Sequence, residues 1–326
     1  MELKTPGTIR SSTDEDKPHI HEIAVAAWQP IFNRYRLIVG DEMWNDVWKG
    51  WDEDWFANAS GFVTELDGQV AGFATYWEPI KDVLAEVGGN AVHPKFQRRG
   101  IGTAQMRYLV DKFREWGYKC TKVLTGVDPA HGPARAEYRK VGFRGGVKHS
   151  RYFNYLDEVA RVPVRSSLTV RCATPDDATL LCEMTRSAWA TVYNSLRGTL
   201  GDEIFNIAFR NALEEKVKKV DEVVSDNPEK VRIITEAKQP AGFAILDQNQ
   251  GKKLGELRSV GVIPDFRGRG IGCALCMDAF QIFRDSGLQY ACLPTDLGEV
   301  NEQTRQMCWN VGLYREIPSV DYYMML

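Results

Sequence analysis

The sequence has no long apolar run and no strong excess of either charge. None of its 326 residues lies in a stretch near the roughly 18 apolar residues needed to cross a bilayer, and the polar N-terminal segment lacks the apolar core of a signal peptide. Its 41 basic and 44 acidic residues leave a net charge of -3, so the overall field does not attract nucleic acid or anionic lipid. We therefore expect a cytoplasmic protein that binds neither nucleic acid nor a membrane.

Cysteine and histidine are too scattered to form a disulfide framework or a metal site. The seven cysteines are an odd number, and Cys273 and Cys276 form a CxxC without a second CxxC or paired histidines nearby. The five histidines are also dispersed. We therefore expect inert thiols and no bound metal. The apolar share of 44% is typical of a soluble globular protein, and the length suits two domains.

An internal repeat spans most of the chain. An offset of 161 residues aligns residues 8–45 with residues 169–206 without a gap, so that Trp28 meets Trp189 and Gly40 meets Gly201. Further along, an offset of 170 residues aligns residues 71–143 with residues 241–313. The chain is therefore interpreted as a tandem duplication, with one unit over residues 1–157, a linker over 158–167 and a second unit over 168–326.

The difference between the two offsets places an insertion in the second unit. The additional residues lie between about positions 210 and 240, where ALEEKVKKVDEVVSDNPEK is rich in charge. This composition predicts a longer helix and loop, and we expect it to be an exposed elaboration.

Each unit shows the same coarse order of elements. A short strand precedes a helix that Thr13 or Thr174 opens, with acidic residues in its first turn. A second helix, a hairpin around residues 66–68, a strand ending at Val92 and a helix ending at Gly117 follow in the first unit. A strand, a helix and a final strand complete each unit, so the pattern predicts a mixed α/β fold.

The stretch HPKFQRRGIGTAQM and its copy IPDFRGRGIGCALC predict an anion-binding turn between a strand and a helix. A helix N-terminus leaves backbone N–H groups unpaired and attracts negative charge, glycine allows close approach, and arginine adds bidentate donors. A pyrophosphate suits this arrangement. The candidate residues are Gln97, Arg98, Arg99, Gly100, Ile101, Gly102 and Thr103 in the first unit, and Arg267, Gly268, Arg269, Gly270, Ile271, Gly272 and Cys273 in the second.

Neither of the two common phosphate loops fits these residues. A dinucleotide fingerprint GxGxxG would need glycine at Arg98 in the first unit and at Cys273 in the second. A Walker loop would need GK followed by Ser or Thr, which neither copy contains. The pattern that remains in both units is [QR]xxGxG.

This pattern, with its V-x-P lead-in and a later helix ending in GF or GL, resembles the coenzyme A loop of the GNAT superfamily of N-acyltransferases. The resemblance covers nearly the whole chain as two tandem domains, an architecture that mycothiol synthases also have. It implies two GNAT-like domains, each a mixed, mostly antiparallel sheet flanked by helices, with acetyl-CoA as the co-substrate whose pyrophosphate rests on the motif.

The resemblance also implies catalytic roles. Glu86 and Glu256 each lie eleven residues before the motif and correspond to a glutamate that serves as general base in some members of the family. An amine is mostly protonated at neutral pH, so a base is needed. Tyr138 corresponds to the tyrosine that protonates the leaving thiolate, whereas the second unit has Cys308 there.

Further cofactor contacts follow from the same resemblance. The backbone N–H of Val92 or Val262 is expected to bind the thioester carbonyl. Asn301 matches an asparagine that often contacts the cofactor, and the first unit has His131 in its place. Each unit thus departs once from the family pattern, and the pair Glu86 and Tyr138 favours the first unit as the catalytic one.

The acceptor is weakly encoded. Trp44, Trp48, Trp51 and Trp55 recur at helical spacing, which indicates either one buried helix face or an aromatic wall for the acceptor. We expect direct acetyl transfer to a primary amine of a small molecule, because no cysteine is placed beside a histidine to form an acyl-enzyme. The alternatives are a non-catalytic acyl-CoA sensor and a peptide or protein N-acetyltransferase. Either a monomer or a homodimer is compatible with the sequence.

Overall fold

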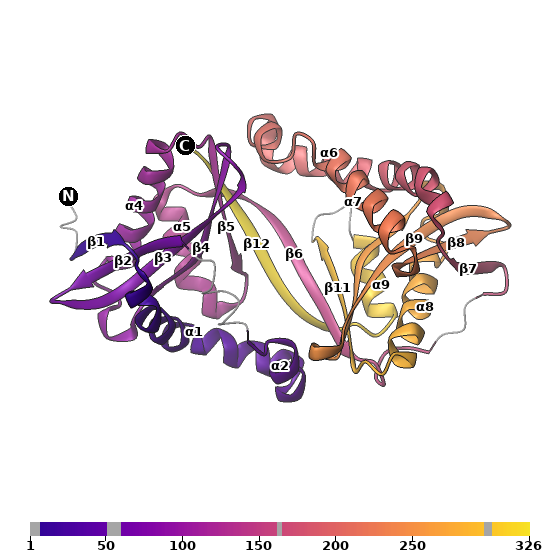
Figure 1. The fold of residues 1–326 in the computed structure, drawn as a ribbon, viewed down its shortest axis with the longest axis horizontal. Helices are drawn as coiled ribbons and strands as arrows, with labels where there is room; N and C mark the ends of the chain where they lie inside the picture. Colours follow the sequence, from indigo (N-terminus) through magenta and orange to yellow (C-terminus); the bar gives the residue numbers. More distant parts are fainter. Residues whose placement is uncertain (1–6, 51–59, 162–164, 297–301) are drawn as a thin grey trace.

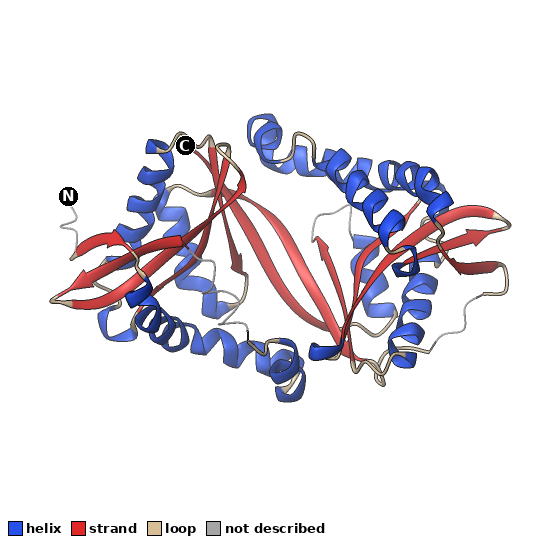
Figure 2. Ribbon diagram, in the orientation of Figure 1, coloured by secondary structure: helices blue, strands red, loops and turns tan. Residues whose placement is uncertain are grey.

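A computed structural model describes residues 7–50, 60–161, 165–296 and 302–326 of the chain. Two lobes lie side by side, and helices cover their strands (Figures 1 and 2). The first repeat forms β1 (Thr8–Ser11), α1 (Lys17–Val39), α2 (Asp41–Val47), β2 (Ser60–Leu66), β3 (Gln69–Ile80), β4 (Leu84–Val92), α4 (Ile101–Glu115), β5 (Cys120–Gly126), α5 (Gly132–Val141) and β6 (Arg144–Tyr155).

The elements of the second repeat are β7 (Leu168–Cys172), α6 (Ala178–Ala208), α7 (Ala212–Asp226), β8 (Val231–Glu236), β9 (Gln239–Asn249), β10 (Leu254–Val262), α8 (Ile271–Asp285), β11 (Tyr290–Asp296), α9 (Glu302–Asn310) and β12 (Arg315–Met325). The described elements of the second repeat follow the same order, with α6 covering the positions of both α1 and α2, and with α7 between α6 and β8. The mixed α/β fold with a mostly antiparallel sheet is confirmed.

Local features of the two repeats match in detail. Thr13 and Thr174 each form a capping box with the acid three residues later, and Asp16 is also paired with Arg10 at 2.7 Å. Gly40 separates α1 from α2 with φ 90°, and Gly201 interrupts α6 with φ 77°. The predicted helix starts and the duplication are therefore visible in the backbone.

The final strands of the two repeats are exchanged. All described strands form one sheet in the order β1-β2-β3-β4-β5-β12-β6-β11-β10-β9-β8-β7. The last strand of the second repeat, β12, pairs with β5, while β6 of the first repeat pairs with β11. Both strands also pair with each other and cross the centre of the molecule (Figure 1). Each lobe therefore completes its sheet with a strand from the other repeat.

The exchanged strands also carry core residues. The core of the first lobe contains Val320, Tyr322 and Met324 from β12, and the core of the second contains Tyr152 from β6. Because buried apolar area is the main source of folding stability, each repeat depends on the other for its core.

The inserted segment is more buried than its composition suggests. Helix α7 packs against α6 and places Val217, Val220 and Val224 in the interior. The predicted helix is present over Ala212–Asp226, but the expectation of an exposed elaboration was wrong for one face of this helix, which is apolar at helical spacing. Among the described helices, none combines the length and apolar character that a membrane crossing requires.

Candidate functional site

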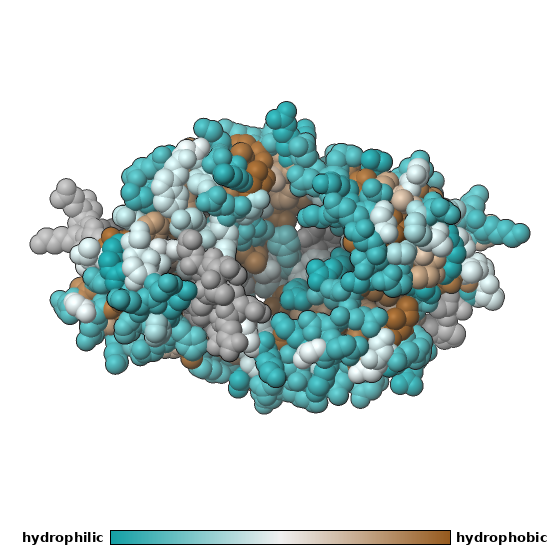
Figure 3. Space-filling model, viewed as in Figure 1, coloured by the Kyte–Doolittle hydropathy of each residue, from teal (hydrophilic) through white to brown (hydrophobic). Residues whose placement is uncertain are grey.

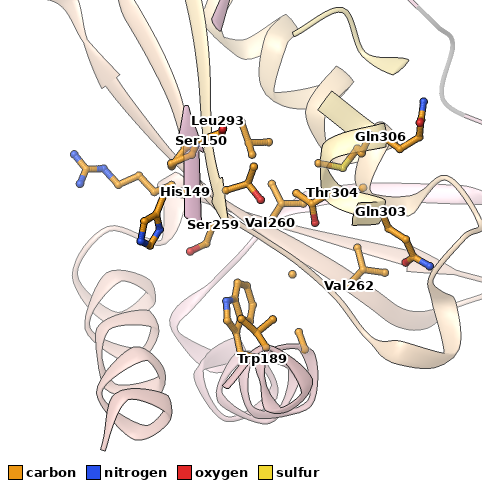
Figure 4. Close-up of a pocket in the computed structure, with 18 of the residues that line it drawn as sticks. His149, Ser150, Trp189, Ser259, Val260, Val262, Leu293, Gln303, Thr304 and Gln306 are labelled. Atoms are coloured by element: carbon orange, nitrogen blue, oxygen red, sulfur yellow. The ribbon is translucent and has the colours of Figure 1, made fainter. Parts of the chain in front are cut away.

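A large cavity opens in the second lobe, beside the second glycine-rich motif. Its volume is about 820 Å³, and its lining comes from α6, α7, β10, α8, β11 and α9 together with the central strands β5, β6 and β12. Figure 3 shows that the molecular surface is hollowed between the two lobes, and Figure 4 shows side chains from several of these elements around the cavity. The exchange of strands thus gives this cavity walls from both repeats.

The cavity lies where two parallel strands, β10 and β11, stop pairing. Strands β10 and β11 pair only from Leu254 with Tyr290 to Glu256 with Cys292. Beyond that point β10 continues to Val262, and its register with β9 shifts between Leu257 and Ser259. The β11-facing edge of β10 therefore presents backbone groups that an extended ligand can pair with.

The Val262 amide faces this opening. Ile263 N–H donates to the Ala241 carbonyl on the β9 side at 3.0 Å. Successive amides of a strand point to opposite sides, so the Val262 N–H is directed toward β11 and the cavity. The same argument applies to Val92, because His93 N–H donates to the Ala71 carbonyl at 2.9 Å. The backbone geometry suits the predicted contact with a thioester carbonyl in both units.

The second motif has the backbone geometry that the sequence analysis expected of an anion-binding turn. Gly268 and Gly270 have positive φ angles of 73° and 80°, and Gly270 caps α8. The first turn of this 15-residue helix has N–H groups without intrahelical partners, and Gly270, Ile271, Gly272 and Cys273 all line the cavity. A phosphate group at this end would be held by backbone donors and by the helix dipole.

The arginines of the motif have structural partners. Arg267 donates to the Ala188 carbonyl at 2.8 Å and to the Val262 carbonyl at 3.3 Å, which ties α6 to the turn. Arg269 pairs with Glu236 at 3.3 Å. In the first unit Gln97 likewise donates to the Val92 carbonyl at 3.1 Å. The side chain of the first residue of [QR]xxGxG therefore holds the turn in place, and backbone N–H groups remain as the main candidate donors to an anion.

The first motif has the same backbone but a different neighbour. Gly100 has φ 84° and caps α4, while Arg98 has φ 62° where the second unit has Gly268. The Glu137 carboxylate on α5 packs so closely on Gly102 that a side chain there would meet Glu137 Oε2 at 2.7 Å. In the second unit the corresponding neighbour of Gly272 is the uncharged Met307. An ionised Glu137 therefore opposes a phosphate on the first motif.

Glu137 is itself poorly solvated. Its Oε1 is buried and has no hydrogen-bond partner among the described residues. Burial raises the pKa of Glu137 to about 7, an effect that Lys140 partly offsets. The carboxyl is therefore partly ionised at neutral pH, in contact with the turn that the sequence assigned to a pyrophosphate.

Replacing Glu137 by glutamine is expected to remove a pH-dependent destabilisation. A folded-state pKa raised above the unfolded value makes stability fall as pH rises from about 4.5 to about 7. Glu137→Gln should raise the free energy of unfolding by about 3 kcal/mol at pH 8 and change it little at pH 4. Urea denaturation at both pH values measures this, and an equal effect at both would contradict it.

The predicted catalytic residues of the first unit are engaged with neighbours. Glu86 pairs with Lys122 at 3.1 Å, and burial, the larger effect, raises the pKa of Glu86 against the influence of that lysine. Tyr138 is buried and donates its O–H to Asn90 Oδ1 at 2.7 Å, and burial raises its pKa. The structure brings neither residue to the large cavity, whereas Lys122 lines it.

The predicted residues of the second unit divide between two places. Glu256 pairs with Arg151 at 2.9 Å and lies 3.7 Å from Arg258, in a smaller cavity of about 260 Å³. Cys308 is fully buried, and burial raises its pKa. Asn301 lies outside the described residues. The motif and Val262 therefore meet in the large cavity, while Glu256 does not line it.

Trp44 of α2 lies in the core, and the half-buried Trp48, which directly follows this helix, packs against it. Trp44 is 5% exposed, stacks on Trp48 with ring centroids 4.9 Å apart, and both pack with Phe153 from β6. The interpretation as one buried helix face is confirmed for these two residues. Trp51 and Trp55 lie outside the described residues.

Three side chains of the cavity were not found from the sequence. His149 on β6 and Asp321 on β12 lie 3.1 Å apart, and Lys216 on α7 contacts Ser259 Oγ at 3.2 Å. No motif surrounds them, because strand exchange and the insertion bring them to the site. The sequence offers one hint for two of them, because these positions differ between the repeats: His149 corresponds to Ser319, and Asp321 corresponds to Arg151.

Comparisons with known proteins agree with this architecture. The family model described as "Acetyltransferase (GNAT) family" matches residues 17–143 and 189–306, which together exceed half of the chain. No match was found among curated proteins.

Similar solved structures support the same fold. A GCN5-related N-acetyltransferase from Sphaerobacter thermophilus is 20% identical, with a TM-score of 0.63 over 99% of this chain and 97% of that one. A tandem GNAT protein from the clavulanic acid biosynthesis pathway is 16% identical, with a TM-score of 0.51 over 82% and 83%. A glucosamine N-acetyltransferase region of a fungal multi-domain β-N-acetylglucosaminidase is 16% identical, with a TM-score of 0.62 over 98% of this chain and 39% of that protein.

Proposed function

Because the chain belongs to the acetyltransferase (GNAT) family and is an acyl-CoA-dependent N-acyltransferase, we propose that it moves an acetyl group from acetyl-CoA to a primary amine of a small molecule. The family generally uses acetyl-CoA. The observation that carries the proposal is the continuous cavity from the N-terminus of α8 to the opening between β10 and β11.

The second unit is the site we favour for this reaction. Its turn has glycine at both left-handed positions and uncharged Met307 beside Gly272, whereas Glu137 opposes an anion at the first motif. This reverses the preference that the sequence pattern gave for the first unit. The first unit would then serve as a structural partner that supplies β6 to the active lobe.

Direct attack suits the groups that line the cavity. The lone pair of the neutral amine nitrogen attacks the thioester carbonyl, the C–N bond forms, and the C–S bond breaks with its electron pair leaving on sulfur. One proton lost by the nitrogen ends on that sulfur, so the products are an amide and the thiol of coenzyme A. The Val262 N–H would stabilise the oxyanion of the tetrahedral intermediate. Cys273, which lines the cavity, is not a convincing nucleophile, because burial raises its pKa.

The size of the cavity supports a small acceptor. A volume of about 820 Å³ lies in the range of small-molecule sites. The lining also carries more basic than acidic side chains, with Lys122, Arg151, Lys216, Arg258 and Arg267 against Asp321. This composition favours the phosphates of the cofactor and an acceptor that is not strongly cationic overall.

The function is tested by thiol release from acetyl-CoA in the presence of amines. We expect release above the enzyme-free rate with at least one member of a panel containing amino acids, glucosamine, polyamines, aminoglycosides and short peptides. Mass spectrometry of the product should locate the acetyl group on nitrogen. Binding of acetyl-CoA without release for any acceptor would favour an acyl-CoA sensor, and release with peptides alone would favour a peptide N-acetyltransferase.

A further inference from the structure

The smaller cavity, of about 260 Å³, adjoins the large one and has no part in the reaction described above. Arg151 of β6 and Arg258 of β10 line both cavities, so the two spaces meet at these side chains. The other residues of the small cavity come from the second lobe and from the first repeat. They are Asp247, Asn249, Lys252, Leu254 and Glu256, with Val47 and Trp48.

The first repeat closes one side of the small cavity. Its helix α2 lies against the base of the second lobe (Figure 1). Tyr290 donates its O–H to Asp46 Oδ2 at 2.6 Å, and Lys253 Nζ pairs with the same carboxylate at 3.0 Å. Trp48 packs on Phe153 of β6, with ring centroids 5.5 Å apart. The cavity therefore has an aromatic wall that contacts between the two repeats hold in place.

Basic side chains outnumber acidic ones in this lining. Arg151, Lys252 and Arg258 stand against Asp247 and Glu256. Lys252 belongs to a turn that is fixed by its backbone N–H, which donates to Asn249 Oδ1 at 2.9 Å. The excess of positive charge in a concave space favours an anionic ligand.

The two arginines are oriented by carboxylates and keep donors for a ligand. Arg151 donates from Nη2 to Glu256 Oε2 at 2.9 Å. Arg258 donates from Nε and Nη2 to one oxygen, Asp247 Oδ2, at 3.1 and 2.7 Å. A guanidinium group has five N–H donors, so these contacts use only part of each group. The side chains are 45% and 60% exposed, and carboxylate or phosphate oxygens can therefore reach them.

The distance from the expected thioester to the arginines sets the length of such a ligand. Val262 and Arg258 are four residues apart on β10, or about 13 Å at the rise of a strand. Ser259, between them, lines the large cavity. An amine beside the thioester and an anion at Arg258 therefore belong to an elongated molecule. An α-amino acid, in which one carbon joins the two groups, does not span this distance.

Resting on the proposed function, we propose that the small cavity is an acceptor subsite in which Arg151 and Arg258 bind an anionic group at the far end of an elongated primary amine. The anion is a carboxylate or a phosphate, which share the oxygens that arginine recognises. Lys252 adds positive charge, and Trp48 and Leu254 give an apolar surface beside the anion. The subsite lowers KM for acceptors long enough to reach it and takes no part in bond making.

The first lobe has no equivalent of this subsite. The positions that correspond to its three basic residues lie at the offset of 170 residues. They hold Asp321, Asp82 and Gly88 in place of Arg151, Lys252 and Arg258. The basic lining is therefore specific to the lobe that we favour for the reaction.

The test compares amines of matched length as acceptors for the full chain, with thiol release from acetyl-CoA as the readout. The neutral series is ethylamine, butylamine and hexylamine, and the carboxylate series is glycine, 4-aminobutanoate and 6-aminohexanoate. We expect kcat/KM for 6-aminohexanoate to exceed that for hexylamine by about 10-fold or more, since arginine forms charge-assisted hydrogen bonds to the anion. Glycine should gain nothing over ethylamine. A third arm with 6-aminohexyl phosphate shows whether carboxylate or phosphate gives the larger gain.

Variants assign the preference to the arginines. Arg258→Gln should lower the ratio of kcat/KM between 6-aminohexanoate and hexylamine by about 10-fold, through KM and not kcat. Asp247→Asn removes a carboxylate that competes for Arg258 and should raise this ratio by about 3-fold. Because a packing defect would not change the ratio in opposite directions, the pair excludes a merely structural effect. Arg114→Gln, on the exposed face of α4, should match the wild type.

The outcomes separate this subsite from the proposed function. An active wild type that prefers the neutral amine, or that uses both series equally, overturns the subsite and leaves the acetyltransferase standing. An unchanged ratio in both Arg258→Gln and Arg151→Gln overturns the role of the arginines. Thiol release only with acceptors that carry no anion also overturns it. No thiol release by the wild type with any amine overturns both the subsite and the proposed function.

Discussion

Replacing Met307 by glutamate is expected to abolish acetyl-CoA binding. Met307 packs on Gly272 at the start of α8, where Glu137 packs on Gly102 in the first unit. A carboxylate about 4 Å from a phosphate charge opposes it by roughly 4 kcal/mol at an effective dielectric constant of 20. An increase in Kd of at least about 100-fold should follow, measured by calorimetry at pH 8, where the introduced carboxyl is ionised.

Two matched variants isolate the charge. Met307→Gln has a similar shape without the charge and should keep most of the affinity, which excludes a packing defect as the cause. Glu137→Met removes the opposing charge from the first motif and should leave binding at the second unchanged. If Met307→Glu bound acetyl-CoA normally while Gly100→Arg abolished binding, the cofactor would belong to the first unit.

Separating the two repeats is expected to abolish the monomeric fold of both. Residues 1–157 lack β12, which pairs with β5 over Ser319 to Met325, and residues 158–326 lack β6, which pairs with β11 over His149 to Tyr155. Each half would expose the edge of its β5 or β11 strand and the core residues that the missing strand covers. Neither half should unfold cooperatively as a monomer in urea.

Co-expression supplies the control for this prediction. The two halves produced together should form a one-to-one complex with the unfolding transition of the intact chain. A half produced alone should be insoluble or should dimerise by using its own last strand in place of the absent one. A soluble, cooperatively folded monomer of residues 1–157 would contradict the dependence of each lobe on the exchanged strand.

The repeat and the local signals could be predicted from the sequence because neighbouring residues determine them. Thr13 and Thr174 begin helices because their side chains cap the first turn, and Gly100 and Gly270 take the left-handed conformation that glycine favours. The [QR]xxGxG motif located both turns at helix N-termini. These features depend on residues that are close together in the sequence. They therefore recur at matching positions when the two repeats are aligned.

Long-range placement could not be predicted in the same way. The periodicity of β6 and β12 indicates a strand but does not say which lobe each strand joins. Consequently the pair of His149 and Asp321 remained hidden, since its members are 172 residues apart and come from opposite repeats. The position of Glu137 beside the first motif could not be predicted either. Only the packing of α5 on α4 shows that its carboxylate lies against Gly102.

A crystal structure with acetyl-CoA bound tests the central claim most directly. We expect the pyrophosphate on the backbone of residues 268–273, the thioester between β10 and β11 near Val262, and the acetyl group in the part of the cavity that His149 lines. Acetyl-CoA bound at residues 98–103, with the second motif empty, would contradict it.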